Sequence, residues 1–325
     1  MTSRSFGYLA LFAAVLIASP TRAQEAFPSK PVTVVVPSSA GGSIELQVRL
    51  LSDSFRERTG QSLVVVNRPG AMGTTGTTFV YRAPADGYTL LASPNSPMVF
   101  NPLTHKALSY EPLKMTPVVL LGVQPLVMGV RGALPGKTLD DLIAYAKSNP
   151  GKTYYGSQGV GGGNHMAAML FGKHIGADLK HVPFPGAGPA GQALLKGEID
   201  FFMAPLAVLL PWYREGSIKI LAMGSQQRAK DAPDVPTFRE LGYPEDFILT
   251  VWSVLMGPPD MPAAIADKLN AAFADILKEP KVRERFAQLA VEPGGGSRQE
   301  LAAMLERETK TWTRVAQENR IEKQE

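Results

Sequence analysis

Glycine-rich segments that join short apolar runs to helical patterns are the parts of this sequence best suited to chemistry. Three of them are PSSAGG (37–42), NRPGAMGTTG (67–76) and SQGVGGGNH (157–165). The first amides of a helix lack partners inside the helix and lie at the positive end of its dipole. Glycines and small hydroxyl residues leave such amides accessible, which favours binding of a phosphate or a carboxylate. The alternative is that the glycines only permit tight turns and close packing.

Phosphate cofactors do not fit the spacing of these segments. GAMGTTG lacks the G-x-G-x-x-G spacing of a dinucleotide site, and no segment matches G-x-x-x-x-G-K-[ST]. GVGGG precedes a helical pattern, but no acidic residue follows at the offset that a ribose needs. We therefore expect no cofactor.

Catalytic and metal-binding patterns are also missing from the sequence. The four histidines, His105, His165, His174 and His181, have no metal-ligand spacing, and the chain has no cysteine and no G-x-S-x-G motif. His174 is interpreted as an exposed helical residue and His181 as the start of a strand. His165, in the first turn after a glycine segment, either donates to an anion or caps the helix. We expect no catalytic residue, no metal site and no enzyme.

Glu45 places a carboxylate in the first turn of the helix that follows PSSAGG. A carboxylate there is stabilised by the helix dipole and can accept hydrogen bonds from the local amides. Apart from capping, Glu45 could serve ligand binding by organising the loop, or by holding water or an amino group of a ligand. Capping is the favoured interpretation.

The elements around these segments follow a βαβ pattern. Short β-branched runs predict buried strands at 32–36, 62–66 and 88–93, with helices between them at 45–59 and 74–83. The same pattern returns as a helix at 138–148 with Thr138 as its N-cap, strands at 153–157, 180–184 and 199–204, and helices at 164–175 and 189–196. The sequence predicts an α/β fold with mostly parallel sheets flanked by helices.

Two such series predict two lobes rather than one large sheet. The chain then returns through apolar runs at 218–225 and 247–259, and it ends in helices at 262–277 and 298–319. A strand-rich return followed by helices indicates that the C-terminal part packs back on the first lobe.

Two crossovers between the lobes are expected, near 122–124 and near 251–253. Residues 27–122 and 253–325 would form lobe 1, and residues 123–252 would form lobe 2. A cleft would then lie between the lobes.

The N-terminal segment predicts export. A positive charge at Arg4, an apolar run at 8–18 and small residues before the cleavage point predict a secretory signal peptide at 1–23. A transmembrane anchor needs about 20 apolar residues, more than this run contains. The formal net charge of +4 falls to +2 when Arg4 and Arg22 are removed with the signal, which is too little to indicate a nucleic-acid partner.

Segments throughout the mature chain resemble the periplasmic solute-binding proteins of tripartite tricarboxylate transporters, the Bug or TctC-like family. The most specific match is NRPGAMGTTG (67–76) followed by ADGYTLL (85–91). Further matches are FPSKPVTVVVPSSAGGSIELQVR, SPNSPMVFNPL, YYGSQGVGGGNHMA, HVPFPGAGPAGQALLKGEID, PTFRELGYP and VWSVLMGPPDMPAAIADKLNAAF. The resemblance implies a two-lobed, type II-like binding protein of the periplasm. It implies a monomer that captures a small carboxylated solute without a metal and passes it to membrane permease subunits.

The resemblance also implies ligand-binding residues. In the family, a loop from each lobe grips a carboxylate through backbone amides, hydroxyls and ordered water. The corresponding positions of lobe 1 are Ser38, Ser39, Ala40, Gly41, Gly42, Ser43 and Glu45, with Ser96 and Asn101 from a third segment. Those of lobe 2 are Ser157, Gly159, Val160, Gly161, Gly162 and His165, with Met203 and Ala204 at the end of a strand.

This chain departs from the family pattern at several of these positions. The family usually has an aromatic residue at Ser38, an aspartate at Glu45, a serine at Gly162 and a Phe-Asp pair at Met203 and Ala204. Fewer carboxylates and an added methionine would make the pocket wall less polar, provided that these side chains reach it. The hypothesis is a dicarboxylate or aromatic carboxylate with apolar bulk, because apolar walls match small hydrated acids poorly.

The predicted function is therefore a non-enzymatic periplasmic receptor. One alternative is a sensory module that binds the same solute but signals to a two-component system. A secreted hydrolase is a weaker alternative, because it needs a nucleophile and a base within hydrogen-bond reach, and the sequence shows no such pair.

Overall fold

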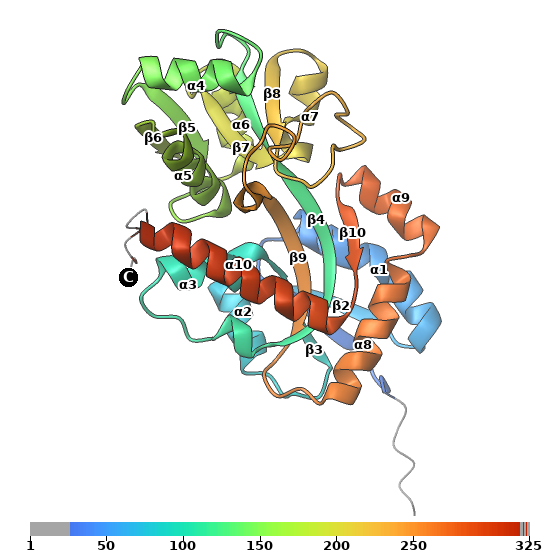
Figure 1. Ribbon diagram of the computed structural model, residues 1–325. Helices are drawn as coiled ribbons and strands as arrows, with labels where there is room; N and C mark the ends of the chain where they lie inside the picture. Colours follow the sequence, from blue (N-terminus) through green and yellow to red (C-terminus); the bar gives the residue numbers. More distant parts are fainter. Residues whose placement is uncertain (1–26, 319–320, 322, 324–325) are drawn as a thin grey trace, which may run out of the picture.

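The computed structural model describes residues 27–318, 321 and 323, and it has two lobes connected by long strands (Figure 1). The predicted signal peptide at 1–23 lies outside the described residues. The α/β class and the two-lobed architecture predicted from the sequence are confirmed. None of the helices in residues 27–318 has the length and apolar character of a membrane span.

The first lobe contains a parallel unit of three strands. β1 (Val32–Val36) lies between β2 (Leu63–Asn67) and β3 (Thr89–Pro94), and both neighbours run parallel to it. α1 (Ser43–Thr59) follows β1, and α2 (Thr74–Tyr81) follows β2. The valines of β1 are almost all buried, as expected for a strand covered on both faces.

The second lobe repeats this unit. β5 (Thr153–Ser157) lies between the parallel strands β6 (Leu179–Pro183) and β7 (Phe201–Pro205). α5 (Gly163–Ile175) follows β5, and α6 (Ala187–Lys196) follows β6. In both lobes the first strand is therefore central, and the loop at its carboxyl end leads into a helix. In open α/β sheets this edge, where the strand order reverses, is where ligands bind.

A long strand, β4 (Thr116–Arg131), belongs to the sheets of both lobes. Its first half pairs with β9 (Thr250–Gly257) and β10 (Glu292–Gly295), and its second half pairs with β7 and with β8 (Ile218–Met223). All these pairings are antiparallel, and β9 also runs antiparallel to β3. The sheets are thus mixed rather than mostly parallel, because each parallel unit is extended by strands that return from the other lobe.

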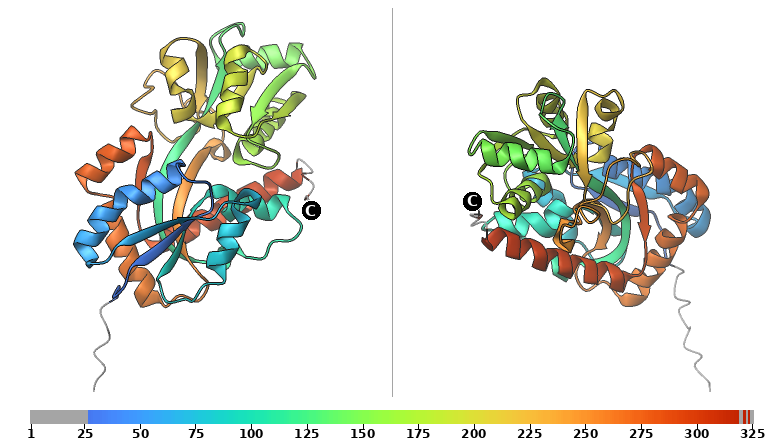
Figure 2. Two further views of the ribbon diagram at one scale, coloured as in Figure 1. Left: turned by 180° about the vertical axis from the view of Figure 1, so that it is seen from behind. Right: turned by 45° about the horizontal axis from the view of Figure 1, so that its top comes forward.

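The two crossovers lie side by side in the middle of the molecule. Gly122 of β4 is paired with Ser253 of β9, and Pro125 is paired with Thr250. The Leu126 amide donates to the Leu249 carbonyl at 2.9 Å, just beyond this paired stretch. The crossover positions near 122–124 and 251–253 are therefore adjacent strands of one antiparallel pair, as Figure 2 shows from behind.

Some elements are present that the sequence did not predict. They are α7 (Leu206–Arg214), α9 (Pro280–Gln288), α3 (Asn101–Thr104), β10 and the short helical turns at Ala71–Gly73, Ser96–Phe100, Pro112–Lys114 and Glu245–Phe247. β10 reads EPGG, a sequence typical of a turn, and it exists because it pairs with β4. By contrast, α4 (Leu139–Ser148) begins with the predicted Thr138 N-cap, in a capping box with Asp141.

The C-terminal helix α10 (Arg298–Glu318) follows α8 (Ala263–Ile276), α9 and β10, and it lies across the first lobe with its end next to α5 of the second (Figure 1). It packs on β4 and on the 96–100 turn, where the Trp312 ring meets the Phe100 ring edge-on at 5.2 Å. At its far end Glu318 pairs with Lys173 of α5 at 2.6 Å. One hydrophobic cluster likewise runs from the first lobe into the second, so the lobes share buried contacts.

Candidate ligand-binding site

Two loops end in the same pair of glycine conformations, immediately before α1 and α5. Loop 1 (residues 37–42) ends with Gly41 at φ +83° and with Gly42, the α1 N-cap, at φ −75° and ψ 158°. Loop 2 (residues 158–162) ends with Gly161 at φ +79° and with Gly162, the α5 N-cap, at φ −71° and ψ 161°. Left-handed φ favours glycine at the first position of each pair. Neither N-cap residue has a side chain, so no N-cap side chain accepts a hydrogen bond from the first-turn amides of either helix.

In loop 1 a carboxylate holds the turn. The Gly41 N–H donates to Glu45 Oε2 at 2.7 Å, and Arg49 Nε donates to Glu45 Oε1 at 2.7 Å. Glu45 is only 5% exposed. The hydrogen bond from Arg49 and the one from the Gly41 amide lower the pKa of Glu45, so its carboxylate is ionised at neutral pH. Glu45 therefore has the capping role that the sequence favoured.

In loop 2 an imidazole takes the same position. The Gly161 N–H donates to His165 Nδ1 at 3.0 Å, which requires a neutral ring that carries its proton on Nε2. Burial, and to a smaller extent His181, lowers the pKa of His165 to about 4. The His165 and His181 rings lie 4.1 Å apart. His165 thus makes the capping contact of the two interpretations, and donation from its Nε2–H to an anion stays a prediction.

Ser157 and His181 form a contact that the sequence did not reveal. Ser157 Oγ lies 2.6 Å from His181 Nε2, and it also accepts a 3.1 Å hydrogen bond from the Gly159 amide. The distance suits a nucleophile and a base, but Ser157 is fully buried at the end of β5 and unreachable by a substrate. His181 stacks on Tyr155 with ring centroids 5.1 Å apart. The pair therefore supports the fold of loop 2.

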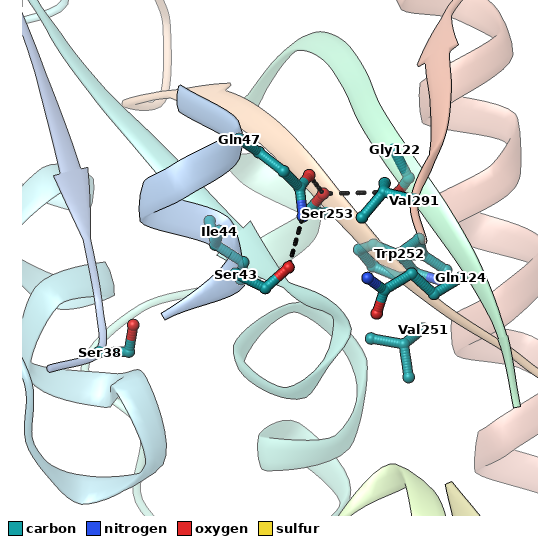
Figure 3. A pocket seen from close by; sticks show the side chains of 10 residues that line it. All are labelled: Ser38, Ser43, Ile44, Gln47, Gly122, Gln124, Val251, Trp252, Ser253 and Val291. Atoms are coloured by element: carbon teal, nitrogen blue, oxygen red, sulfur yellow. Dashed lines mark hydrogen bonds between the residues drawn. The ribbon is translucent and has the colours of Figure 1, made fainter. Parts of the chain in front are cut away.

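A cavity of about 220 Å³ opens beside the N-terminus of α1, between this helix and the crossover strands (Figure 3). It is lined by Ser38, Ser43, Ile44, Gln47, Gly122, Gln124, Val251, Trp252, Ser253 and Val291. Ser38 and Ser43 were predicted as site residues, and both predicted crossovers contribute to the wall. Gln47, which the sequence analysis missed, lies one helical turn after Ser43 on the same face of α1.

Hydrogen bonds connect three walls of this cavity. The Ser253 hydroxyl of β9 donates to Gln47 Oε1 at 2.6 Å, and Gln47 Nε2 donates to Ser43 Oγ at 3.2 Å. Ser253 Oγ is also 3.5 Å from the Gly122 carbonyl of β4. The start of α1 is thus fixed to both crossover strands.

The predicted site residues are brought together only in part. Ser39, Ala40 and Gly41 are exposed beside the cavity, whereas loop 2 does not line it. Loop 2 packs on the first lobe instead: a Cβ atom at Gly161 would collide with the Thr104 side chain. Val160 of loop 2 is 45% exposed at the surface.

Asn101 and Ser96, the predicted positions of the third segment, do not line the cavity. Asn101 is fully buried, and its Nδ2 donates to the Met72 carbonyl at 3.1 Å and to Thr74 Oγ1 at 3.3 Å. It therefore supports the third glycine segment (67–76), whose Gly76 packs on Pro37 at the start of loop 1. Ser96 is half-buried at the start of its turn.

Met203 and Ala204 do not form a pocket wall, contrary to the expectation from the sequence. Both are 0% exposed, and they belong to different hydrophobic clusters because successive side chains of a strand point to opposite faces. The Met203 carbonyl accepts a hydrogen bond from Asn164 Nδ2 of α5.

Residues 47–321 match the model of the family described as tripartite tricarboxylate transporter family receptor. The chain belongs to this family. BugT of Bordetella pertussis is 33% identical over 304 residues, which cover 93% of each chain. Like the receptors of its family, this chain is a periplasmic solute-binding protein and not an enzyme. The family takes up small carboxylate solutes and works with transporter permeases.

Solved structures of related receptors have the same fold. Rpa4515 of R. palustris, solved with adipate, superposes with a TM-score of 0.79 at 30% identity and covers 92% of this chain and 100% of its own. MatC from Rhodopseudomonas palustris, solved with bound malate, gives a TM-score of 0.74 at 32% identity and covers 89% of this chain and 99% of its own.

Proposed function

We propose that this receptor captures a small dicarboxylate or aromatic carboxylate between its lobes and delivers it, as a monomer, to the permease subunits of a tripartite tricarboxylate-type transporter. The observation that supports this most directly is the pair of matching helix N-termini. α1 and α5 each follow the central strand of their lobe and begin with a glycine N-cap that makes no side-chain hydrogen bond to the first-turn amides. Fixed, aligned amides suit a carboxylate because little reorganisation is needed on binding.

The composition of the cavity supports an organic anion with an apolar body. Among the described residues that line it there is no Lys, Arg, His, Asp or Glu; its polar side chains are mainly hydroxyls and amides, and its apolar wall contains Ile44, Val251 and Trp252. These residues provide the apolar surface that the sequence analysis had assigned to Met203 and Ala204. The adipate and malate bound to the two related receptors are both dicarboxylates.

We further propose that closure pivots at the crossovers, with residues 27–122 and 253–325 moving against residues 123–252. Closure would bring the amides of loop 2 toward a solute held at loop 1, as hinge closure does in other binding proteins. Small-angle scattering of the mature protein would then show a smaller radius of gyration with the solute than without it. An unchanged radius with saturating solute would contradict hinge closure.

A thermal-shift panel tests the proposed solute class. The mature protein is screened with monocarboxylates, linear dicarboxylates from succinate to suberate, tricarboxylates, aromatic acids, amino acids and neutral sugars. A solute that binds only the folded state raises the melting temperature, by an amount equivalent to about 2.7 kcal/mol at 100 times its Kd. We expect dicarboxylates or aromatic acids to give the largest shifts. Binding of a neutral solute with no response to any carboxylate would refute the proposal.

A further inference from the structure

Most polar side chains of the cavity are already engaged with one another. Ser43, Gln47 and Ser253 form the hydrogen-bonded chain described above, at 3.2 Å and 2.6 Å. Gln47 and Ser253 are almost completely buried, with 3% of each exposed. Gln47 and Ser253 are therefore fixed parts of the wall, with little capacity left to bind a solute.

Gln124 is different. It lies on β4 at the crossover and is half-buried, and its amide projects into the cavity on the side opposite Ser38 (Figure 3). Its Nε2 makes only a long 3.4 Å hydrogen bond to the Leu289 carbonyl. Among the described residues, no donor is bonded to its Oε1. Gln124 therefore faces the cavity with an amide that is largely free.

The residues around Gln124 leave its amide to determine which solute group can bind at this position. Its neighbours in the wall include the apolar side chain of Val251 and the nearly buried ring of Trp252, and among the described residues no ionisable side chain lines the cavity. A primary amide can donate to a carboxylate or accept from an ammonium or hydroxyl group, and rotation by 180° exchanges the two roles. Nothing else in the wall would counteract a fixed charge at this position.

We propose that Gln124 is the specificity-determining residue for the end of the solute that loop 1 does not hold. This inference rests on the proposed function. With loop 1 at one carboxylate, the Gln124 amide donates to a second anionic group. A negative charge at this position converts the site to one that rejects dicarboxylates, because like charges in a partly buried site repel strongly.

The isosteric substitution Gln124→Glu tests this. Calorimetric titrations use the dicarboxylate that gives the largest thermal shift, its ω-amino monocarboxylate of equal length and the corresponding unsubstituted monocarboxylate. We expect the variant to bind the dicarboxylate at least 10-fold more weakly, to bind the monocarboxylate within 3-fold of wild type, and to reverse the order of dicarboxylate and ω-amino acid. Gln299→Glu, which adds the same charge at an exposed position of α10, is the matched control and should match wild type.

A second variant separates loss of fold from loss of recognition. Gln124→Met keeps the side-chain length without charge or hydrogen bonds, and it should weaken dicarboxylate binding several-fold while leaving the monocarboxylate unaffected. Equal weakening of all three solutes in both variants, or wild-type ratios in Gln124→Glu, overturns the role of Gln124 and leaves the proposed function intact. Failure of the wild-type protein to bind any of these acids overturns the proposed function, and this inference with it.

Discussion

Loop 1 and loop 2 end in the same pair of glycine conformations, but the side chains behind them differ. In both, a glycine with left-handed φ donates its N–H to the side chain four residues later. The acceptor is an ionised carboxylate in loop 1, Glu45, and a neutral imidazole in loop 2, His165. The shared turn requires an acceptor at that spacing and does not require a charge.

The surroundings of the loops differ as well. Loop 1 is exposed beside the cavity, and the charge of Glu45 is balanced by Arg49, with Arg49 Nη2 2.7 Å from Glu45 Oε1. Loop 2 is packed between Thr104 of the first lobe and the stacked rings of His165, His181 and Tyr155. We infer that Gly161 of loop 2 is sensitive to added volume and His165 behind it to protonation, whereas Gly41 of loop 1 has open space around it.

The largest expected effect comes from adding a methyl group to the equivalent glycines. Gly161→Ala places a Cβ at left-handed φ against Thr104, so we expect about 3 to 4 kcal/mol of destabilisation. Gly41→Ala has the same φ but open space around its Cβ, so only the backbone cost of about 1 to 2 kcal/mol applies. Urea denaturation followed by circular dichroism measures both. Equal losses of unfolding free energy in the two variants would show that both glycines have the same space around them.

The next effect is pH dependence arising in loop 2. The pKa of His165 is about 4 in the folded protein, below its ordinary value of 6.5. Between these values the unfolded chain binds more protons than the folded one, so stability is lost as the pH falls from about 6.5 to 4. The loss from this group is on the order of 3 kcal/mol. Burial lowers the pKa of His181 too, which acts in the same direction, whereas Tyr155, with a pKa of about 12, stays neutral.

His165→Asn is the variant that isolates this effect. Its side-chain oxygen can accept from the Gly161 amide in place of Nδ1, but it does not titrate. The free energy of unfolding, measured by urea titration at pH 7 and at pH 4.5, should fall less in this variant than in wild type. If the free energy of unfolding fell equally in both proteins, the acid sensitivity would come from groups other than His165.

The smallest expected effect is loss of the charge in loop 1. Glu45→Gln keeps an oxygen for the Gly41 amide but removes the ion pair with Arg49. Because the Arg49 side chain is 55% exposed, this ion pair is weak, and we expect the melting temperature at pH 7 to fall by roughly 1 to 2 °C. The lowered pKa means that this contribution is present above about pH 4.5 and is lost as the pH falls further. Scanning calorimetry of wild type and variant should show the difference disappear in acid. A melting-temperature difference between wild type and variant that grows in acid would contradict the expected direction.

Local features of the fold were predictable because neighbours along the chain determine them. The Thr138 cap and the capping by Glu45 depend on residues no more than four positions apart, and the apolar runs that predict the strands of both βαβ units are equally local signals. Elements that depend on distant partners were missed. β10 exists because it pairs with β4, although its own sequence is typical of a turn.

The candidate site divides in the same way. The sequence indicated the glycine turns and both crossovers, because glycine spacing and alternating apolar runs are local signals. It could not place Gln47 against Ser253, 206 positions away, or reveal that Met203 and Ala204 lie in the core rather than in a pocket. Side-chain direction across a strand depends on what packs on each face, and a single sequence does not contain that information.

By itself, the amino-acid sequence determined the repeated strand, glycine turn and helix, and with them two helix N-termini suited to an anion. Tertiary structure alone decided that β4 would join both sheets, that the cavity would form where α1 meets the crossovers, and that Gln124 would face it. The physical reason is the distance along the chain between the residues that interact. Backbone hydrogen bonds and caps are set within one helical turn, whereas a cavity wall is made by residues that only the packing of distant strands brings together.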